Sequence, residues 1–377
     1  MHKRTNSQRG FSLLEMLVAA TLGLIVMLAM LSLFRTGMRT TIAVTQRAET
    51  QQNLRAGMEL MSKDLSMAGA GLPSGGLQLP PAASLIACNQ ARTCYVNGNT
   101  YPNANFMYGI IPNFSNGVEN NTGIVNTPGV VNDSVTSIYC DYNFPLTNFN
   151  FTFPNDTSAN VTVINNAVSP NNILAPGGLN VGDVMLFLVT SPGNGQGPQG
   201  NAVGQTAAAV AEITGIPNGG AIDFAANDAL NFNQVGAANS LATIAANFVA
   251  GSTLTACRLN VVTYFLQVPP AGGTVQTPRL MRQVNGLNAV PVADNIINLQ
   301  FSYDVIDSIN QTMSANQSNP IGAGLSPAYI QKVNIWMMGQ GLLPAGGQAQ
   351  SMYLASSVSM RNMSFCNSYG FSTTQCN

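Results

Sequence analysis

The chain has 377 residues, of which 46% are hydrophobic and only 8% are charged, and its formal net charge is −1. Disordered chains combine low hydrophobicity with high net charge, so this composition argues against disorder and predicts one or two folded domains. Beyond Asp64 the balance is six basic against eleven acidic residues, or −5, which argues against a nucleic-acid partner because such surfaces need clustered Lys and Arg.

The amino terminus joins a basic segment to an apolar run. Residues 1–10 carry three basic side chains, and the 19 residues from Met16 to Phe34 carry no charge. At 1.5 Å per residue this run spans roughly 29 Å as a helix, close to the ~30 Å hydrocarbon thickness of a bilayer. It is too long for the core of a secretory signal, and its basic flank predicts a cytoplasmic amino terminus with an exported remainder. A plain signal anchor would fit, but Glu15 would then cost roughly 2.5–3.5 kcal/mol in the membrane.

Residues 9–18, Arg-Gly-Phe-Ser-Leu-Leu-Glu-Met-Leu-Val, resemble the class III signal of type IV prepilins and type II secretion pseudopilins. The resemblance implies that a prepilin peptidase cleaves after Gly10, which removes residues 1–10 as a leader, and that Phe11 is then N-methylated. It also implies that Glu15 neutralises the terminal ammonium of a neighbouring subunit, because lone charges are costly in an apolar filament core.

Removal of the leader would also remove His2, the only histidine of the chain. The mature protein would then lack Ser-His-Asp and Cys-His catalysis and all His-ligated metal sites. No constellation of carboxylates or tyrosines suggests another chemistry, so we expect that the protein is not an enzyme.

The apolar run continues into a long predicted helix. Residues 1–72 contain no proline, so one helix can run from about Ser12 to about Ala68, a rod of roughly 85 Å within the segment 11–69. Its second half carries an apolar stripe with spacings of four and three residues, formed by Leu54, Met58, Met61, Leu65 and Ala68. Off this stripe lie Arg55, Glu59, Lys63 and Asp64. The stripe predicts packing under the chain's own head, with a coiled-coil partner as the alternative.

Residues 70–256 are rich in Asn, Gly, Ala and Pro, and we expect them to form a variable, loop-rich part of the head. Apolar runs predict strands over 135–142, 184–189 and 209–213. Between these strands we expect loops over 112–132 and 192–204.

Residues 257–377 show the clearest alternation of apolar and polar side chains. The pattern is strict over 297–304 and 332–337 and continues at Val358 and Met360, which predicts half-buried strands. Two further strands are expected over 261–268 and 279–283, so this part should be an antiparallel sheet. Trp336 and the Met-rich stretch around it are expected in the core.

The same part resembles minor pilins of the PilW type and the related J-type pseudopilins. The shared features are a Tyr/Phe-rich strand, a basic strand, an acid-led strand and a closing motif, found at 262–266, 279–282, 294–304 and 359–362. The resemblance covers the first 70 and the last 120 residues. It implies an α+β, type IV pilin-like fold, in which a long transmembrane and amphipathic helix packs on an antiparallel head and 70–256 is a large insertion.

This resemblance implies a minor pilin that takes part in type IV pilus assembly, in an initiation or tip complex. Its partners would be other minor pilins and the major pilin. It would reside in the bacterial inner membrane with a periplasmic head and then on the pilus outside the cell. A type II secretion pseudopilin is the alternative within the class, and a surface adhesin that binds its ligand through 70–256 is a rival from another class.

Six cysteines, all beyond the helix, are expected to form disulfides in an exported head: Cys88, Cys94, Cys140, Cys257, Cys366 and Cys376. Six cysteines allow 15 connectivities. The short separations favour the local pairs Cys88–Cys94 and Cys366–Cys376, which would leave Cys140 to pair with Cys257.

We expect no cofactor and no metal. The glycines of 195–200 match a dinucleotide-binding pattern, but Pro198 stands where a phosphate-facing helix would begin, so a loop explains them better. Asp304 with Asp307, and separately Asn132 with Asp133 and Asn155 with Asp156, could supply oxygen ligands to Ca²⁺, but turn capping is their ordinary role.

Overall fold

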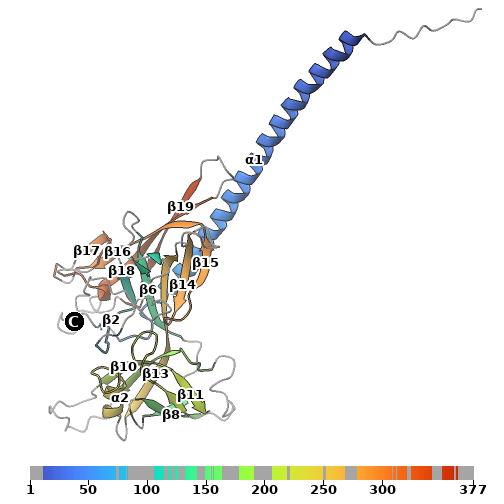
Figure 1. Ribbon diagram of the computed structural model, residues 1–377. Coiled ribbons are helices and arrows are strands. Elements are labelled where there is room, and N and C mark those ends of the chain that lie inside the picture. Colours follow the sequence, from blue (N-terminus) through green and yellow to red (C-terminus); the bar gives the residue numbers. More distant parts are fainter. Residues whose placement is uncertain are drawn as a thin grey trace, which may run out of the picture.

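The fold is a long helix that projects from a β-rich head (Figure 1). The described residues of this computed structural model are 12–73, 76–81, 83, 106–113, 118–119, 124–125, 132–141, 149–153, 155, 157–163, 178–190, 206–218, 221–248, 252–267, 278–307, 309–310, 312–320, 324–341, 350–360 and 362–363. The head has a lobe beside the helix and a second lobe farther away, and the long strand β13 (Thr253–Gln267) reaches into both. An apolar helix with antiparallel sheets is the predicted α+β layout.

Helix α1 (Leu13–Ser66) has almost the predicted bounds. The backbone of Gly69 has a φ of +79°, a left-handed conformation that glycine adopts without strain, and the chain turns there into the head. All five residues of the predicted apolar stripe are buried, which confirms that the second half of the helix packs on its own head. Gly57 permits the close approach, because a Cβ at this position would stand 2.9 Å from the side chain of Leu280.

The largest sheet has nine described strands and is antiparallel except where β13 pairs with β4. Its strands are β3 (Ile110–Asn113), β4 (Val118–Glu119), β5 (Ile124–Val125), β6 (Ser134–Cys140), β9 (Val184–Thr190), β10 (Thr206–Glu212), β13, β14 (Arg279–Val284) and β15 (Val290–Asp294). The first half of β13 pairs with β9, and the second half pairs with β6 and β14. The strand thus runs through the predicted boundary at 256–257, and the two predicted parts of the head share one sheet.

The distant lobe contains the far end of the nine-stranded sheet, a separate four-stranded sheet and a short helix. Its strands are β7 (Phe149–Thr152), β8 (Ser158–Val163), β12 (Ala221–Asp223) and β11 (Gly215–Asn218), and its helix is α2 (Leu241–Asn247). Phe187 lies at the centre of the lobe and makes edge-to-face contacts with Phe151, Phe153 and Phe224. Such ring contacts contribute about 0.5–1.5 kcal/mol each beyond simple burial.

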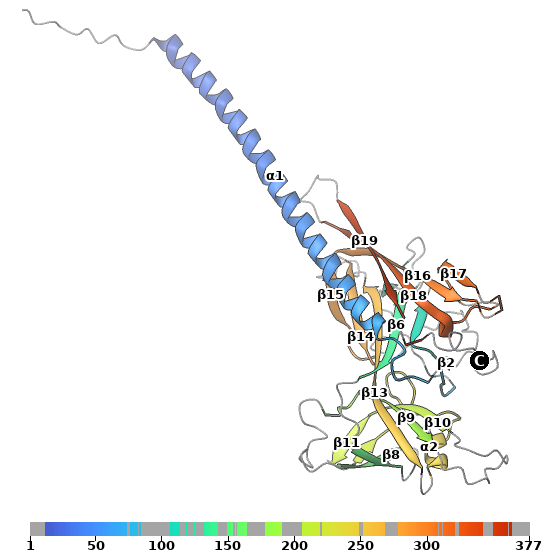
Figure 2. The same ribbon diagram turned by 180° about the vertical axis from the view of Figure 1, so that it is seen from behind.

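The C-terminal sheet has the strand order β17-β16-β18-β19 and is antiparallel throughout. Its strands are β16 (Ile296–Ile306), β17 (Met313–Gln317), β18 (Ile330–Gln340) and β19 (Ser351–Ser359), and the 3-10 turn η2 (Pro327–Tyr329) precedes β18. Figure 2 shows α1 between β15 and β19. The predicted alternation is confirmed from Leu299 to Val305 in β16 and from Val333 to Gly339 in β18, where every second residue is buried. It is wrong at Ile297, because a register shift between Ile296 and Asn298 places Ile296 in the core instead.

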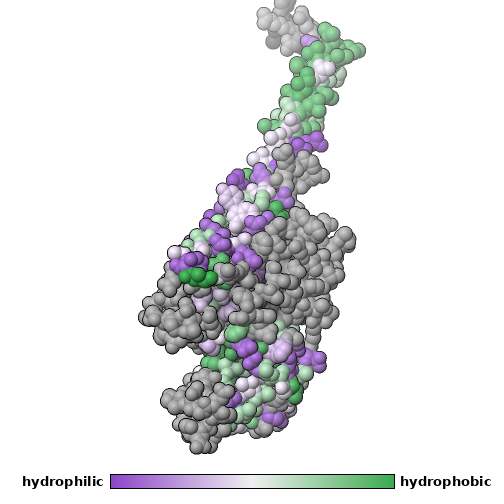
Figure 3. Space-filling view, turned by 90° about the vertical axis from the view of Figure 1, so that its left-hand side faces the viewer, coloured by the Kyte–Doolittle hydropathy of each residue, from purple (hydrophilic) through white to green (hydrophobic). Residues whose placement is uncertain are grey.

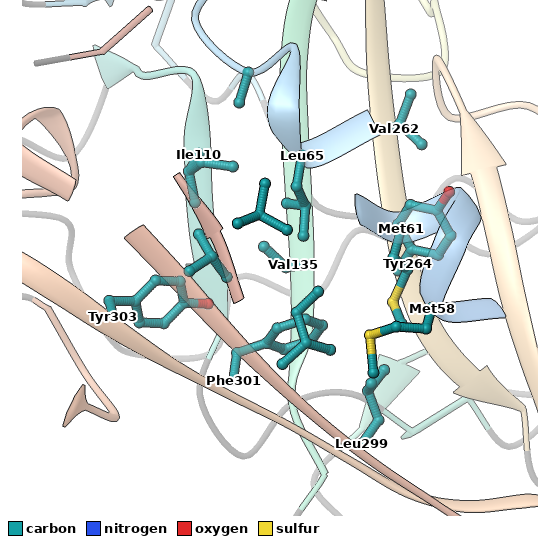
Figure 4. Close-up of a cluster of buried hydrophobic side chains, with 14 of the residues drawn as sticks. Met58, Met61, Leu65, Ile110, Val135, Val262, Tyr264, Leu299, Phe301 and Tyr303 are labelled. Carbon is teal, nitrogen blue, oxygen red and sulfur yellow. The ribbon is translucent and has the colours of Figure 1, made fainter. Parts of the chain in front are cut away.

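The core lies where α1 meets both sheets (Figure 4). Met58, Met61 and Leu65 of the helix pack among side chains of β6, β13 and β16, including Val135 and Leu299. Burial of apolar area stabilises by roughly 25 cal/mol per Å², so these contacts help to hold the rod to the head.

Three sequence-based expectations need correction. The predicted loop 112–132 contains β4, β5 and the end of β3. These strands are too short to carry an alternation pattern, and they form by pairing with other strands: β3 with β6, β4 with β13, and β5 with β4. Trp336 lies outside the core: it is half-buried on the opposite face of β18 from Ile335 and Met337, because strand alternation turns it away from the helix. The remaining two-stranded sheet, β1 (Leu77–Gln78) with β2 (Phe106–Met107), lies in a region for which no strand was predicted.

Candidate functional site

The amino-terminal end of α1 is closed by a capping box. Ser12 Oγ accepts a hydrogen bond from Leu14 N at 3.3 Å, and Glu15 Oε2 accepts one from Ser12 N at 3.1 Å. This reciprocal arrangement satisfies N–H groups that have no partner inside the helix, and it places a negative charge at the positive end of the helix dipole. In the single chain the Glu15 carboxylate is therefore held by its own helix. The predicted cleavage and methylation residues, Gly10 and Phe11, lie outside the described residues.

The first half of α1 stands free of the head, and its visible face is mainly apolar (Figure 3). Its most apolar 18-residue window has a mean hydropathy of 2.5 and is not buried at all, and the helix is long and apolar enough to cross a membrane. Leu33, for example, is 76% exposed. Apolar surface of this extent is unfavourable in water, so this half of the helix requires a lipid or protein environment.

The second half of α1 ends at a buried cluster around Asp64, which is 4% exposed. Its Oδ1 accepts a hydrogen bond from the Tyr139 hydroxyl at 2.8 Å, and its Oδ2 accepts one from the Tyr264 hydroxyl at 2.6 Å. Arg282 Nε donates to the same Oδ2 at 2.8 Å and forms an ion pair with it. The main-chain oxygen of Asp64 accepts a further bond from Ser137 Oγ at 2.8 Å. The last turn of the helix is thereby fixed to β6, β13 and β14.

The protonation states of the cluster follow from burial and from the charge of Asp64. Burial and then the nearby carboxylate raise the pKa of Tyr139 and of Tyr264, so both hydroxyls stay protonated and donate. Burial acts to lower the pKa of Arg282, but the hydrogen bond and charge of Asp64 outweigh it and raise this pKa. The cluster therefore contains one full ion pair with two neutral donors, a combination that leaves no bare charge in the core.

Asp64 was expected to lie off the apolar stripe with Arg55, Glu59 and Lys63, yet it is buried against the head. Its neighbour Leu65 belongs to the stripe and is fully buried. One helical residue turns the side chain by about 100°, so an acid next to a stripe residue lies at the margin of the buried face. That position was a signal that Asp64 could face the head. Its cationic partner, Arg282, lies 218 residues further along the chain, and no local pattern connects the two.

A second set of contacts stands where the two lobes meet. Cys140 at the end of β6 forms a disulfide with Cys257 of β13, and the two Cα atoms are 5.7 Å apart. This is the pair that remained after the two local pairs were predicted from their short separations. Beside it, the Arg258 guanidinium forms an ion pair with Asp141 and a longer one with Asp183 at 3.6 Å. Burial raises the pKa of Asp183 above its ordinary value. The other four cysteines, Cys88, Cys94, Cys366 and Cys376, lie outside the described residues.

The side chains considered as Ca²⁺ ligands accept hydrogen bonds from main-chain N–H groups, in a distant strand for Asn132 and Asp133 and in the following turn for Asp307. Asn132 and Asp133 accept bonds from the main-chain N–H groups of Leu299 and Phe301 and so hold the part of β16 that β17 does not reach. Asp307 accepts bonds from the two N–H groups of the turn that follows it. Within the described part of the chain, His, Cys, Asp and Glu side chains form no group of three that could hold a metal ion. The glycine-rich segment 195–200 and Asp156 lie outside the described residues.

The comparisons with known proteins concern the amino-terminal end. The family model for the prokaryotic N-terminal methylation motif matches residues 5–31. Comparison with curated proteins and with solved structures found no match. The amino terminus therefore carries a type IV pilin-like prepilin signal, continuous with a helix that is long and apolar enough to anchor the chain in a membrane.

Proposed function

We propose that this chain is a minor pilin of the PilW type, a non-enzymatic subunit of the small complex that initiates or tips a type IV pilus. The observation that carries the proposal is the N-terminal methylation motif at 5–31, which leads directly into an unburied apolar helix. The order of the C-terminal strand motifs supports the PilW type. Prepilin peptidase would process the chain, and other minor pilins and the major pilin would be its partners.

In this proposal the two halves of α1 have separate tasks. The apolar half holds the precursor in the inner membrane with its head in the periplasm, and later packs against the helices of neighbouring subunits. The amphipathic half, fixed through Asp64 and the apolar stripe, keeps the head in one orientation relative to the helix. A subunit of this kind can be pulled out of the membrane into a filament without refolding.

Glu15 would change partners on assembly. In the single chain it accepts a hydrogen bond from the main-chain N–H of Ser12. After cleavage the new terminal ammonium would be at Phe11, one residue earlier, and the carboxylate would pair with the ammonium of an adjacent subunit. An ion pair in an apolar surrounding is far less costly than two isolated charges.

Processing gives the first test. We expect mass spectrometry of the membrane-extracted protein to find an amino terminus at methylated Phe11. The same gene expressed in cells without a prepilin peptidase should yield the intact chain, which serves as the control. An intact Met1 in cells that contain the peptidase, or cleavage beyond Phe34, would contradict the proposal.

Assembly gives the second test, through Glu15→Leu. The variant should be cleaved and inserted normally, because leucine suits the apolar run, but the ammonium of Phe11 in a neighbour would lose its partner. At a cost of roughly 3 kcal/mol per contact, incorporation should fall about 100-fold. Recovery in sheared filaments and in complexes with other prepilin-like subunits measures the effect.

Thr21→Leu is the matched control, because Thr21 lies on the same unburied half of α1 and its hydroxyl bonds only to Val18 O of its own helix. It should assemble like the wild type. In a plain membrane anchor the Glu15 carboxylate only raises the cost of membrane insertion, and Glu15→Leu would then leave membrane retention of the chain unchanged or improve it.

The identity of the co-purified subunits separates the two related assemblies. Co-purified pilins support the proposal, and secretion-system components would favour a pseudopilin.

A further inference from the structure

The outer face of the C-terminal sheet, which points away from α1, contains a groove of about 620 Å³. Alternation along the strands places Trp336 of β18 on this face, next to Gln300 of β16 on one side and Ala355 of β19 on the other. Its lining includes Gln300, Asn316, Asn334, Trp336 and Asp133, together with several serines. A tryptophan, three amides and several hydroxyls thus share one concave surface.

The amides of the groove are held in place by a network at its edge. Asp304 Oδ1 accepts hydrogen bonds from Asn316 N at 2.9 Å and from Asn334 Nδ2 at 3.1 Å, and Lys332 Nζ lies 3.2 Å from Asp304 Oδ2. Asn334 Nδ2 also donates to Asn316 Oδ1 at 3.2 Å. These bonds fix two amide side chains before any ligand arrives, which reduces the entropy lost on binding.

The charge of this network is balanced. Burial acts to raise the pKa of Asp304, but hydrogen bonds from Asn316, Lys332 and Asn334 outweigh it and lower the pKa below its ordinary value. Asp304 and Lys332 therefore form a neutral ion pair at neutral pH. Of the described residues that line the groove only Asp133 is charged, and it is acidic, so an anionic ligand is disfavoured.

The lining also disfavours two other kinds of ligand. An apolar ligand would bury the amides and hydroxyls without partners, which costs free energy for each group. An extended peptide usually adds to a free strand edge, whereas β18, which carries Trp336, is paired with β16 on one side and with β19 on the other. What remains is a neutral ligand that presents hydroxyl groups and one flat apolar face.

We propose that this groove binds a neutral saccharide, with a sugar ring stacked on Trp336 and its hydroxyls hydrogen-bonded by Gln300 and Asn334. The side chain of Gln300 makes no hydrogen bond with another described residue, so its amide is available to a ligand. A tryptophan offers a large, rigid contact surface, and a few oriented polar groups around it are the usual composition of a small-molecule site. This binding goes beyond the proposed role in pilus assembly and does not depend on it. It also places a ligand site in the C-terminal sheet rather than in 70–256.

The test uses the intrinsic fluorescence of the full chain in detergent. The chain has one tryptophan, so the tryptophan emission comes from Trp336 in the groove alone. We expect at least one of maltotriose, cellotriose, chitotriose and lactose to shift the emission of Trp336 in a saturable manner, and sialyllactose to bind more weakly than lactose. A panel without any saturable shift, or tighter binding of sialyllactose, would overturn the proposal.

Two variants locate the binding. Gln300→Ala keeps the fluorescent reporter and should weaken the best-binding sugar about fivefold to tenfold, the effect of one lost hydrogen bond at about 1 kcal/mol or slightly more. Tyr353→Ala is the matched control, because Tyr353 is a 74% exposed aromatic on the same face and does not line the groove. Its affinity should equal that of the wild type. Equal weakening by both variants, or by neither, would overturn the assignment of the sugar to this groove.

Discussion

Asp64→Leu should lower the free energy of unfolding of the head by about 3–5 kcal/mol, the usual cost of removing one partner from a buried ion pair. The variant leaves the Arg282 guanidinium in the core without its carboxylate. It also removes the acceptor of two buried tyrosine hydroxyls, Tyr139 and Tyr264, which then lack the hydrogen bonds that offset their desolvation. The free energy of unfolding should therefore fall by more than the loss of the ion pair with Arg282 alone would cause.

Urea unfolding of the full chain in detergent measures this effect, with Trp336 as the reporter, because its sheet packs directly on α1. Glu59→Leu, an exposed acid on the same amphipathic half of the helix, is the matched control and should change the unfolding free energy by no more than about 0.5 kcal/mol. In the double variant Asp64→Leu with Arg282→Met, part of the loss should be recovered, because no charge then remains buried. An Asp64→Leu chain as stable as the control variant would show that the cluster does not attach the helix to the head.

Replacing both Cys140 and Cys257 by serine should also cost about 3–5 kcal/mol. The two residues are 117 positions apart, and in the chain-entropy account a closed loop of about 100 residues gives roughly 4.7 kcal/mol through restriction of the unfolded chain. The ion pair of Arg258 with Asp141 lies next to the disulfide and remains in the variant. The native spectrum should therefore persist in water while the unfolding midpoint moves to lower urea concentration.

The control is the double replacement of Cys366 and Cys376, a pair predicted from its short separation. A loop this short restricts the unfolded chain less than a 15-residue loop does, for which about 3 kcal/mol is expected, so this variant should lose less stability. Peptide mapping without reduction identifies the bridges independently. A Cys140/Cys257 double variant with wild-type stability, or six free thiols in the exported protein, would contradict the account.

The sequence was most informative where one local property decides the structure. The apolar run, the absence of proline and the spacing of Leu54, Met58 and Met61 predicted α1 and its buried stripe, because periodicity within a helix depends only on the helix. The strict alternation in β16 and β18 predicted two strands of the C-terminal sheet for the same reason. The N-terminal motif was readable because it is a contiguous signal, and the comparison at 5–31 supports the same segment.

Only the tertiary structure decided which charges are buried. Asp64 is buried because Arg282 and two tyrosines arrive from three different strands. Trp336 is a different case: its place on the outer face follows from the alternation over 332–337, in which Ile335 and Met337 occupy the buried face, so the expectation of a core tryptophan conflicted with the sequence pattern itself. Strand β13 extends to Thr253 because β9, far from it in sequence, pairs with its first half. Local patterns report what a segment prefers, whereas the free energy of a buried charge or a paired strand depends on groups that only the folded chain brings together.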